Sequence, residues 1–383
     1  MKKNVWSASV ILMLLCNSVT VKAQVNRAIT TAVPFLLISS DARASGLADQ
    51  GVATSPDAYS QQWNPSKYVF SDRKIKTAIS YTPYLGKLVN DIGLLTLAGA
   101  YKIDERSVVS GGLRYFSLGE IEFTNNTGVS IGGTQVTNIQ KPNEMCLDAS
   151  YALKLSPNLS GAVTARYIRS DLKLQEDINE ARAGNAFGVD LSAYYRGNEV
   201  PYQNFNGRFV GGINISNIGP KIKYNDTDQG DFLPTKFALG GGYDFMIDQY
   251  NTITPYVEFT KLLVPTPTTD GGIGTDVSSF GALFSSWFDA PNGMSEEIAE
   301  FTFSVAGEYR YQDVFALRLG YFNESNMKGA RKHMTFGAGI KYSSMMLDVS
   351  YLYSVSQTVS PLEGTLRFGL TLEFGEYFDN EDF

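Results

Sequence analysis

The sequence predicts an all-β fold, a 14-stranded antiparallel transmembrane β-barrel with an N-terminal plug in its lumen and short helices in one extracellular loop. Three observations predict it. Strand-length segments that alternate apolar with polar or small side chains fill the chain from Ile75 onward. The connections between these segments are alternately short and long, and the segment 24–72, which lacks the alternation, precedes them.

Composition limits the class of protein. The chain has 383 residues, of which 13% are aromatic and 19% charged, with 39 acidic residues against 32 basic ones. After residue 21, no stretch approaches the roughly 20 apolar residues that a membrane-spanning helix needs. The negative net charge and the lack of a Lys/Arg run exclude a typical nucleic-acid-binding protein. A β-rich chain remains, either soluble or in an outer membrane.

Residues 1–23 have the pattern of a cleaved signal peptide. Lys2 and Lys3 form a basic start, Val10–Leu15 is a short apolar core, and Val21–Ala23 forms a cleavage site before Gln24. The mature chain then keeps one Cys, which forms no internal disulfide.

The alternation in the remaining chain has the period of two that is typical of strands. In Phe301–Tyr311, for example, Phe303 and Val305 lie on one face, and Ser304 and Glu308 on the other. Fourteen such segments are predicted, at 74–82, 92–101, 107–117, 144–155, 158–170, 185–196, 207–217, 235–247, 251–263, 300–311, 313–323, 332–343, 345–355 and 363–375.

The connections favour a membrane barrel over a soluble β-sandwich. Long connections such as 118–143 and 264–299 alternate with tight ones such as 104–106, and only 197–206 departs mildly from this order. Outer-membrane barrels have this asymmetry and an even strand number, because a sheet in lipid must close to satisfy its backbone groups. A sandwich also alternates but normally has shorter strands. We therefore expect an outer-membrane protein with extracellular long loops and both termini in the periplasm.

The predicted domains are the signal peptide 1–23, a lumenal hatch 24–72 and the barrel 73–383, with 264–299 as a long extracellular loop. The hatch segment is rich in Gly and small residues and contains a short motif. Its residues are Arg43, Gly46, Gly51, Asp57, Asn64 and Pro65.

This motif resembles the N-terminal hatch signature of the FadL-type long-chain fatty-acid transporters, which are fourteen-stranded barrels with a hatch. Within that superfamily the chain most resembles the PorV family, the outer-membrane barrels of the type IX protein secretion system of Bacteroidota. Pro34–Arg43, Trp63–Lys67, Tyr81–Leu85 and Thr254–Glu258 carry this closer match. Each hatch residue is expected to be structural, with glycines at tight turns and Asn-Pro at a fixed bend, or to act in gating.

The resemblance implies a non-enzymatic role in secretion. Similar proteins bind the C-terminal β-domain of secreted cargo that leaves the large outer-membrane translocon, and carry it to the surface sortase and attachment complex. The alternative is a FadL-like channel for hydrophobic small molecules such as long-chain fatty acids. The inward faces, rich in Ser, Thr, Gly and charge, mildly disfavour such a conduit.

One face of a predicted helix in the long loop is a candidate partner surface. Phe280, Leu283, Phe284, Trp287 and Phe288 have the spacing of that face. It either tucks over the barrel mouth, forms an exposed patch that docks cargo or translocon, or contacts outer-membrane lipid.

No catalytic residue, metal site or cofactor is predicted. The single histidine, His333, is expected at the surface near a strand end, and the sequence places no nucleophile beside it. Inward Arg and Asp residues are interpreted first as lumenal ion pairs.

Overall fold

The computed structural model describes residues 27–125, 135–172, 182–225, 229–268, 277–356 and 360–378. The predicted signal peptide lies outside these ranges. No helix among the described residues is both long and apolar enough to cross a membrane.

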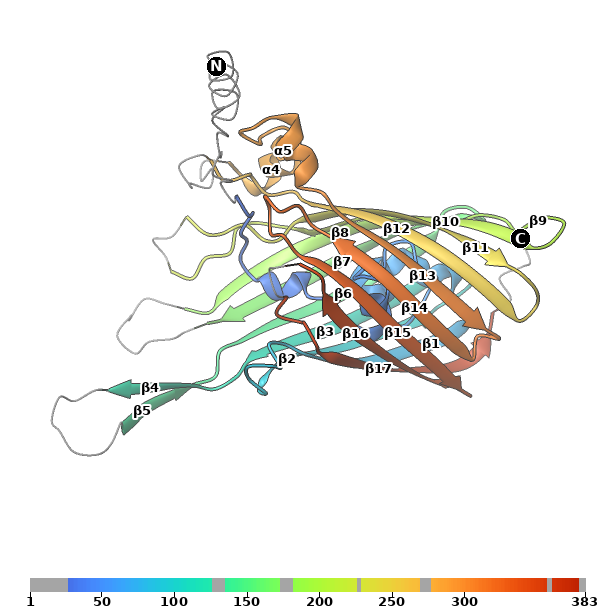
Figure 1. Cartoon of the computed structure of the whole chain (residues 1–383), viewed down its shortest axis with the longest axis horizontal. Coiled ribbons are helices and arrows are strands. Elements are labelled where there is room, and N and C mark those ends of the chain that lie inside the picture. Colours follow the sequence, from blue (N-terminus) through green and yellow to red (C-terminus); the bar gives the residue numbers. More distant parts are fainter. Residues whose placement is uncertain are drawn as a thin grey trace, which may run out of the picture.

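Fourteen antiparallel strands form a closed barrel, as the sequence predicts (Figure 1). The last strand pairs with the first, with Leu370 opposite Ile79, and this pairing completes the ring. The wall strands are β1 (Arg73–Pro83), β2 (Ile92–Lys102), β3 (Ser107–Leu118), β6 (Asn143–Lys154), β7 (Leu159–Asp171), β8 (Gly184–Arg196), β10 (Asn206–Ile218), β11 (Lys236–Met246), β12 (Asn251–Leu262), β13 (Thr302–Tyr311), β14 (Phe315–Asn323), β15 (Lys332–Tyr342), β16 (Met345–Ser354) and β17 (Leu366–Tyr377).

Three short strands were not predicted. β4 (Ile121–Asn125) and β5 (Gln135–Gln140) pair only with each other within the described chain, in the long connection between β3 and β6. β9 (Val200–Pro201) pairs with β10 in the medium-length connection. These strands were missed because each is too short for a period of two to stand out from a loop.

The two faces of the wall differ as a membrane barrel requires. On β13, Phe303 and Val305 point outward and are 36% and 48% exposed, whereas Ser304 and Glu308 are buried on the lumenal side. The inward acidic residues predicted from the sequence are buried, and they include Asp148, Asp190, Asp244 and Glu258. An apolar exterior meets lipid, and the polar interior requires partners within the lumen.

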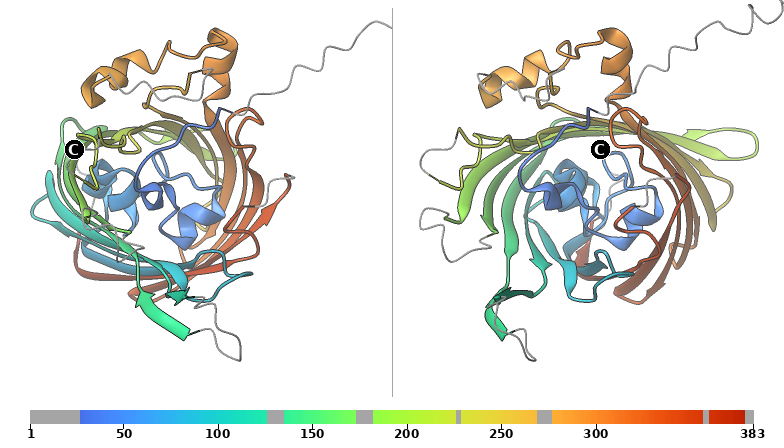
Figure 2. Two further views of the ribbon diagram at one scale, coloured as in Figure 1. Left: turned by 90° about the vertical axis from the view of Figure 1, so that its left-hand side faces the viewer. Right: turned by 60° about the vertical axis from the view of Figure 1, so that its left-hand side comes forward.

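The N-terminal segment supplies those partners, because it lies inside the ring of strands (Figure 2). It contains the 3₁₀-helices η1 (Pro34–Leu37) and η2 (Pro65–Phe70) and the short helices α2 (Ala42–Gly46) and α3 (Ser60–Trp63). Asp41 caps α2 by accepting a hydrogen bond from the Ala44 N–H at 2.7 Å. The hatch is therefore a set of single turns, each terminated by polar contacts.

Two more helices, α4 (Ser279–Ser285) and α5 (Met294–Ala299), lie in the long connection between β12 and β13. Seen along the barrel, they lie outside the ring rather than over the lumen (Figure 2). We call this pair the overhang. The interpretation of a helix tucked over the mouth is therefore wrong, since the helix packs on the outer side of the rim.

The two ends of the described chain lie at opposite mouths of the barrel. The Arg27 N–H donates to the Met327 carbonyl at 3.2 Å, in a connection at the end that carries the long loops, here the long-loop mouth. β17 ends at Tyr377 at the opposite, short-turn mouth. The described chain thus enters the lumen from the long-loop mouth and ends at the short-turn mouth, and the prediction that both termini are periplasmic stays a prediction.

Candidate functional site

Arg43 of the hatch is joined to the barrel wall by a buried ion-pair network. Its guanidinium donates to both carboxylate oxygens of Glu308 on β13, at 3.1 and 2.9 Å, and to Asp57 at 2.6 Å. Arg318 of β14 also donates to Glu308, at 2.8 Å, and reaches Asp348 of β16 at 2.6 Å. A bidentate, desolvated pair of this kind fixes both position and orientation. Arg43 therefore fixes α2 to β13, and Arg318 extends the network to β14 and β16.

Gly51 and Asn64 fasten the other side of the hatch. Glu258 of β12 accepts hydrogen bonds from the N–H groups of Gly51 and Val52, both at 2.9 Å. The Asn64 amide donates to the carbonyls of Val52 and, on β8, of Ala193, both at 2.9 Å. Its side-chain oxygen accepts from Ser66, and Pro65 is the first residue of η2. These motif residues therefore organise the backbone of the hatch.

Gly46 marks the closest approach of hatch and wall. A Cβ atom at this position would lie 2.9 Å from the Cα of Gly337 on β15. The Gly46 carbonyl accepts a hydrogen bond from the Thr335 hydroxyl at 3.0 Å. Backbone meets backbone here, which only glycine permits.

The structure thus brings the six hatch-motif residues together in one segment that is held to the barrel wall by hydrogen bonds and ion pairs. The structure adds four wall partners that the sequence did not single out as such, namely Glu258, Glu308, Arg318 and Asp348. It also adds the hatch residue Gln61, whose amide donates hydrogen bonds to Asp148 and Ser150 of β6. The sequence signal for the wall partners was a charged residue at an inward strand position. This signal does not identify the hatch residue that each wall partner contacts.

A second ion-pair cluster lies at the long-loop mouth and includes Glu296 of the overhang. Glu296 of α5 accepts from Arg27 at 3.0 and 2.8 Å and from Lys328 at 2.7 Å. Lys328 also donates to Glu300 at 2.8 Å. Burial alone would raise the pKa of Glu296, but the hydrogen bonds from Arg27 and Lys328 outweigh it and lower that pKa to about 2. The entry of the hatch is therefore tied to the overhang by charge.

This cluster predicts an acid-sensitive mouth. A lowered pKa stabilises the folded state above the ordinary Glu value of 4.5, and this stabilisation is lost as the pH falls toward 2. We expect proteolysis of the segment around Arg27 to increase across that window. Limited digestion with an acid-active protease checks this. Glu296→Gln should be cleaved readily already at pH 5, and a wild-type protein equally resistant at pH 5 and pH 2 would contradict the expectation.

Three carboxylates near the same mouth have the spacing of metal ligands. Oxygen atoms of Asp289, Glu297 and Glu300 lie within 4.8 Å of one another. The Lys261 ammonium group pairs with Glu297 and Glu300, and the Thr266 hydroxyl lies within hydrogen-bonding distance of Asp289 and Glu300, to one of which it donates. Burial and these neighbouring glutamates raise the pKa of Asp289. Lysine occupies the position of a cation, so the group is an ion-pair network.

The predicted partner face divides into two parts. Phe280, Phe284 and Phe288 are 69%, 71% and 79% exposed. Leu283 is half-buried, and Trp287 packs on the outward ring of Phe237 at 5.3 Å and on Phe301 at 6.1 Å, measured between ring centroids. Leu283 and Trp287 hold α4 against the rim, whereas the three phenylalanines are exposed. Met294 and Ile298 on α5 are exposed as well.

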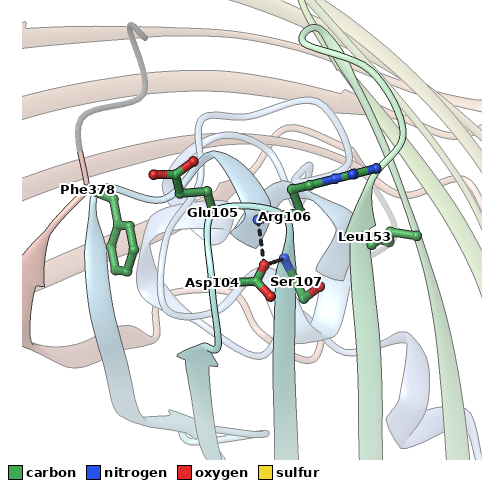
Figure 3. Close-up of a pocket in the computed structure, with 6 residues that line it drawn as sticks. All are labelled: Asp104, Glu105, Arg106, Ser107, Leu153 and Phe378. Carbon is green, nitrogen blue, oxygen red and sulfur yellow. Dashed lines mark hydrogen bonds between the residues drawn. The ribbon is translucent and has the colours of Figure 1, made fainter. Parts of the chain in front are cut away.

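Two hollows lie near the mouths. A cavity of about 650 Å³ at the long-loop mouth lies between the hatch and the wall. His333 lines it, stacked on Phe322 with its Nε2 3.4 Å from Asp49. The expectation of a surface histidine is wrong, because its position on β15 faces the lumen. At the short-turn mouth, a hollow of about 730 Å³ borders the turn of Asp104, whose carboxylate accepts two backbone hydrogen bonds (Figure 3).

A closed wall of fourteen strands with an apolar exterior and a salt-bridged plug defines an outer-membrane β-barrel protein. Residues 21–269, more than half of the chain, match the family model of PorV, described as type IX secretion system protein PorV. The chain belongs to the PorV family and is thus an outer-membrane component associated with type IX secretion.

Similar solved structures include three barrels. The toluene transporter TodX of P. putida is 10% identical, with 88% of this chain and 99% of that chain covered and a TM-score of 0.48. The toluene transporter TbuX of Ralstonia pickettii is 10% identical, with 89% and 100% covered and a TM-score of 0.48. A FadL homologue of Pseudomonas aeruginosa is 12% identical, with 91% and 100% covered and a TM-score of 0.42. Comparison with curated proteins gives no match.

Proposed function

We propose that this protein binds the C-terminal signal domain of secreted cargo as it leaves the type IX translocon, and delivers it to the surface sortase and attachment complex. Family membership supports the role in secretion. The observation that carries the docking step is the set of three exposed phenylalanines of the overhang, Phe280 and Phe284 on α4 and Phe288 just after it, beyond the barrel rim. In this arrangement the long-loop mouth is extracellular and the C-terminal strand ends in the periplasm.

The chemistry of the overhang suits a protein partner. Contiguous exposed apolar surface is rare on proteins that act alone, and aromatic anchors provide much of the binding energy at interfaces. Phe284 on α4 and Phe288 just after the helix are both more than two-thirds exposed, so both can enter pockets on a partner. Phe284 lies near the end of α4 and Phe288 directly follows Trp287, whose packing on Phe237 holds this segment in place and lowers the ordering cost of binding.

The contacts of the hatch bear on the alternative, a channel for hydrophobic small molecules. The cavity beside His333 opens toward the long-loop mouth and has apolar walls at Ile29, Leu37 and Phe322. A solute crossing the lumen would then meet the buried pairs of Arg43 with Glu308 and of Glu258 with the Gly51 N–H. Passage requires that charged groups lose these partners in a dry interior, which is costly. The fastened hatch thus favours docking over conduction.

The docking step is tested by Phe284→Asp with Phe288→Asp in cells that lack the native copy. We expect at least about tenfold less surface-attached cargo, because the loss of two interface anchors removes more than ~1 kcal/mol each. Cargo is measured on intact cells and in the periplasm, and by mass spectrometry of proteins retained on the tagged barrel from solubilised outer membranes.

Leu88→Asp is the matched control, since Leu88 is 79% exposed in another loop at the same mouth. It should leave secretion unchanged. Wild-type amounts of cargo on the double variant would refute docking through the overhang. Recovery of the barrel with a bound apolar molecule and without cargo would favour the channel.

A further inference from the structure

A groove runs between the overhang and the outer surface of the barrel. It has a volume of about 860 Å³, and Leu283 and Phe280 of α4 line one side of it. Val189 and Leu191 of β8 line the other. These two residues are 42% and 48% exposed, whereas Asp190 between them is buried and pairs with Arg166 in the lumen. The groove therefore lies on the face of the wall that meets lipid.

A β-bulge in the wall borders this groove. The pairing of β10 with β8 shifts register between Ile215 and Ile218, and Asn217 in the bulge has a φ of 61°. The Asn217 N–H donates to Asp190 at 2.7 Å, so the bulge is held from the lumenal side. Beyond Ile218 the chain leaves the sheet, and α4 forms a roof over the outer surface of β8.

Two lysines line the same groove. Ile222 is fully buried in a lumenal apolar cluster and pairs with Asp231 in an isolated β-bridge. In this extended segment, Lys221 and Lys223 on either side of Ile222 turn the other way, toward the groove. The Lys221 ammonium lies 4.2 Å from the centroid of the Phe232 ring, close to the apolar surface. The groove thus combines an apolar lining with positive charge.

We propose that this groove binds one anionic lipid of the leaflet that borders the long-loop mouth, with an acyl chain under α4 and the headgroup phosphate between Lys221 and Lys223. The groove continues the lipid-facing surface of β8, so a chain enters it without leaving an apolar environment. Basic residues at the edge of the apolar layer attract anionic headgroups. The lipid site goes beyond the proposed function; Phe280 borders both surfaces, but Lys221, Lys223 and the wall of β8 lie apart from the Phe284 and Phe288 pair that tests docking.

The proposal is tested by quenching of a tryptophan placed in the groove. Trp287→Phe with Leu283→Trp puts the reporter among the lining residues, and Trp63 in the hatch remains as a constant background. The barrel is reconstituted in phosphatidylcholine vesicles that contain a minor fraction of lipid with brominated chains. That lipid is either phosphatidylglycerol or phosphatidylcholine. We expect clearly stronger quenching by the brominated phosphatidylglycerol.

Lys221→Glu with Lys223→Glu in the reporter protein should weaken phosphatidylglycerol binding about tenfold or more and abolish the headgroup preference. Lys87→Glu, a charge reversal in another loop of the same mouth, should retain it. Equal quenching by both lipids would overturn the proposal, since the groove would then contact only bulk bilayer. No quenching by either lipid would also overturn it, because the groove would be closed to lipid. Heat-dependent gel migration verifies that each variant is folded.

Discussion

Arg43→Met is expected to destabilise the barrel by about 3–5 kcal/mol, because it removes one partner of a buried ion pair and leaves carboxylate charge uncompensated. Glu308 is 1% exposed and loses a bidentate contact, and Asp57 loses its bond at 2.6 Å. Urea unfolding of the protein in lipid vesicles, followed by circular dichroism, measures the change in free energy of unfolding. Hydrogen exchange shows whether α2 opens first.

Two variants test the cause of that loss. Arg43→Met with Glu308→Gln removes the orphaned charge and should recover part of the stability. Lys74→Met interrupts the pair of Lys74 with Glu376 on the exposed rim and should have no measurable effect. If Arg43→Met unfolds at the wild-type urea concentration, the network does not hold the hatch in the way we describe.

Gly46→Ala is expected to loosen the hatch by about 1–3 kcal/mol through overpacking. The new methyl group would lie 2.9 Å from the Cα of Gly337, and backbone on both sides cannot move aside as a flexible side chain can. The expected result is faster hydrogen exchange in α2 and a lower urea midpoint, with the wall strands still formed. Mass-spectrometric exchange with peptide resolution distinguishes the hatch from the wall.

Gly307→Ala provides the matched control, because a Cβ atom at this position on β13 would have nothing within 4 Å. It should leave both the urea midpoint and the exchange of α2 unchanged. Equal effects of the two alanine substitutions would mean that the close approach of α2 to β15 is not the reason for glycine at position 46.

The wall of the barrel was predictable because its signal is local. Alternation with a period of two identifies a strand and assigns each residue to a face, as Phe303 and Ser304 show. The strand count and the placement of buried charges such as Asp190 followed from that alternation. The ends of strands were less certain, since β17 runs from Leu366 to Tyr377 rather than over 363–375, and the residues that flank a strand continue its pattern.

The contents of the lumen and the position of the overhang were decided by the tertiary structure. Arg43 and Glu308 are 265 positions apart in the sequence, and nothing local pairs an inward carboxylate with a particular hatch residue. The same limit explains the burial of His333 and the course of the chain from Arg27 into the long-loop mouth. The spacing of Phe280 and Phe284 defined a helical face, but only packing of Trp287 on Phe237 decided that it lies outside the ring. Periodicity determines which side of an element is apolar, whereas long-range packing determines what that side meets.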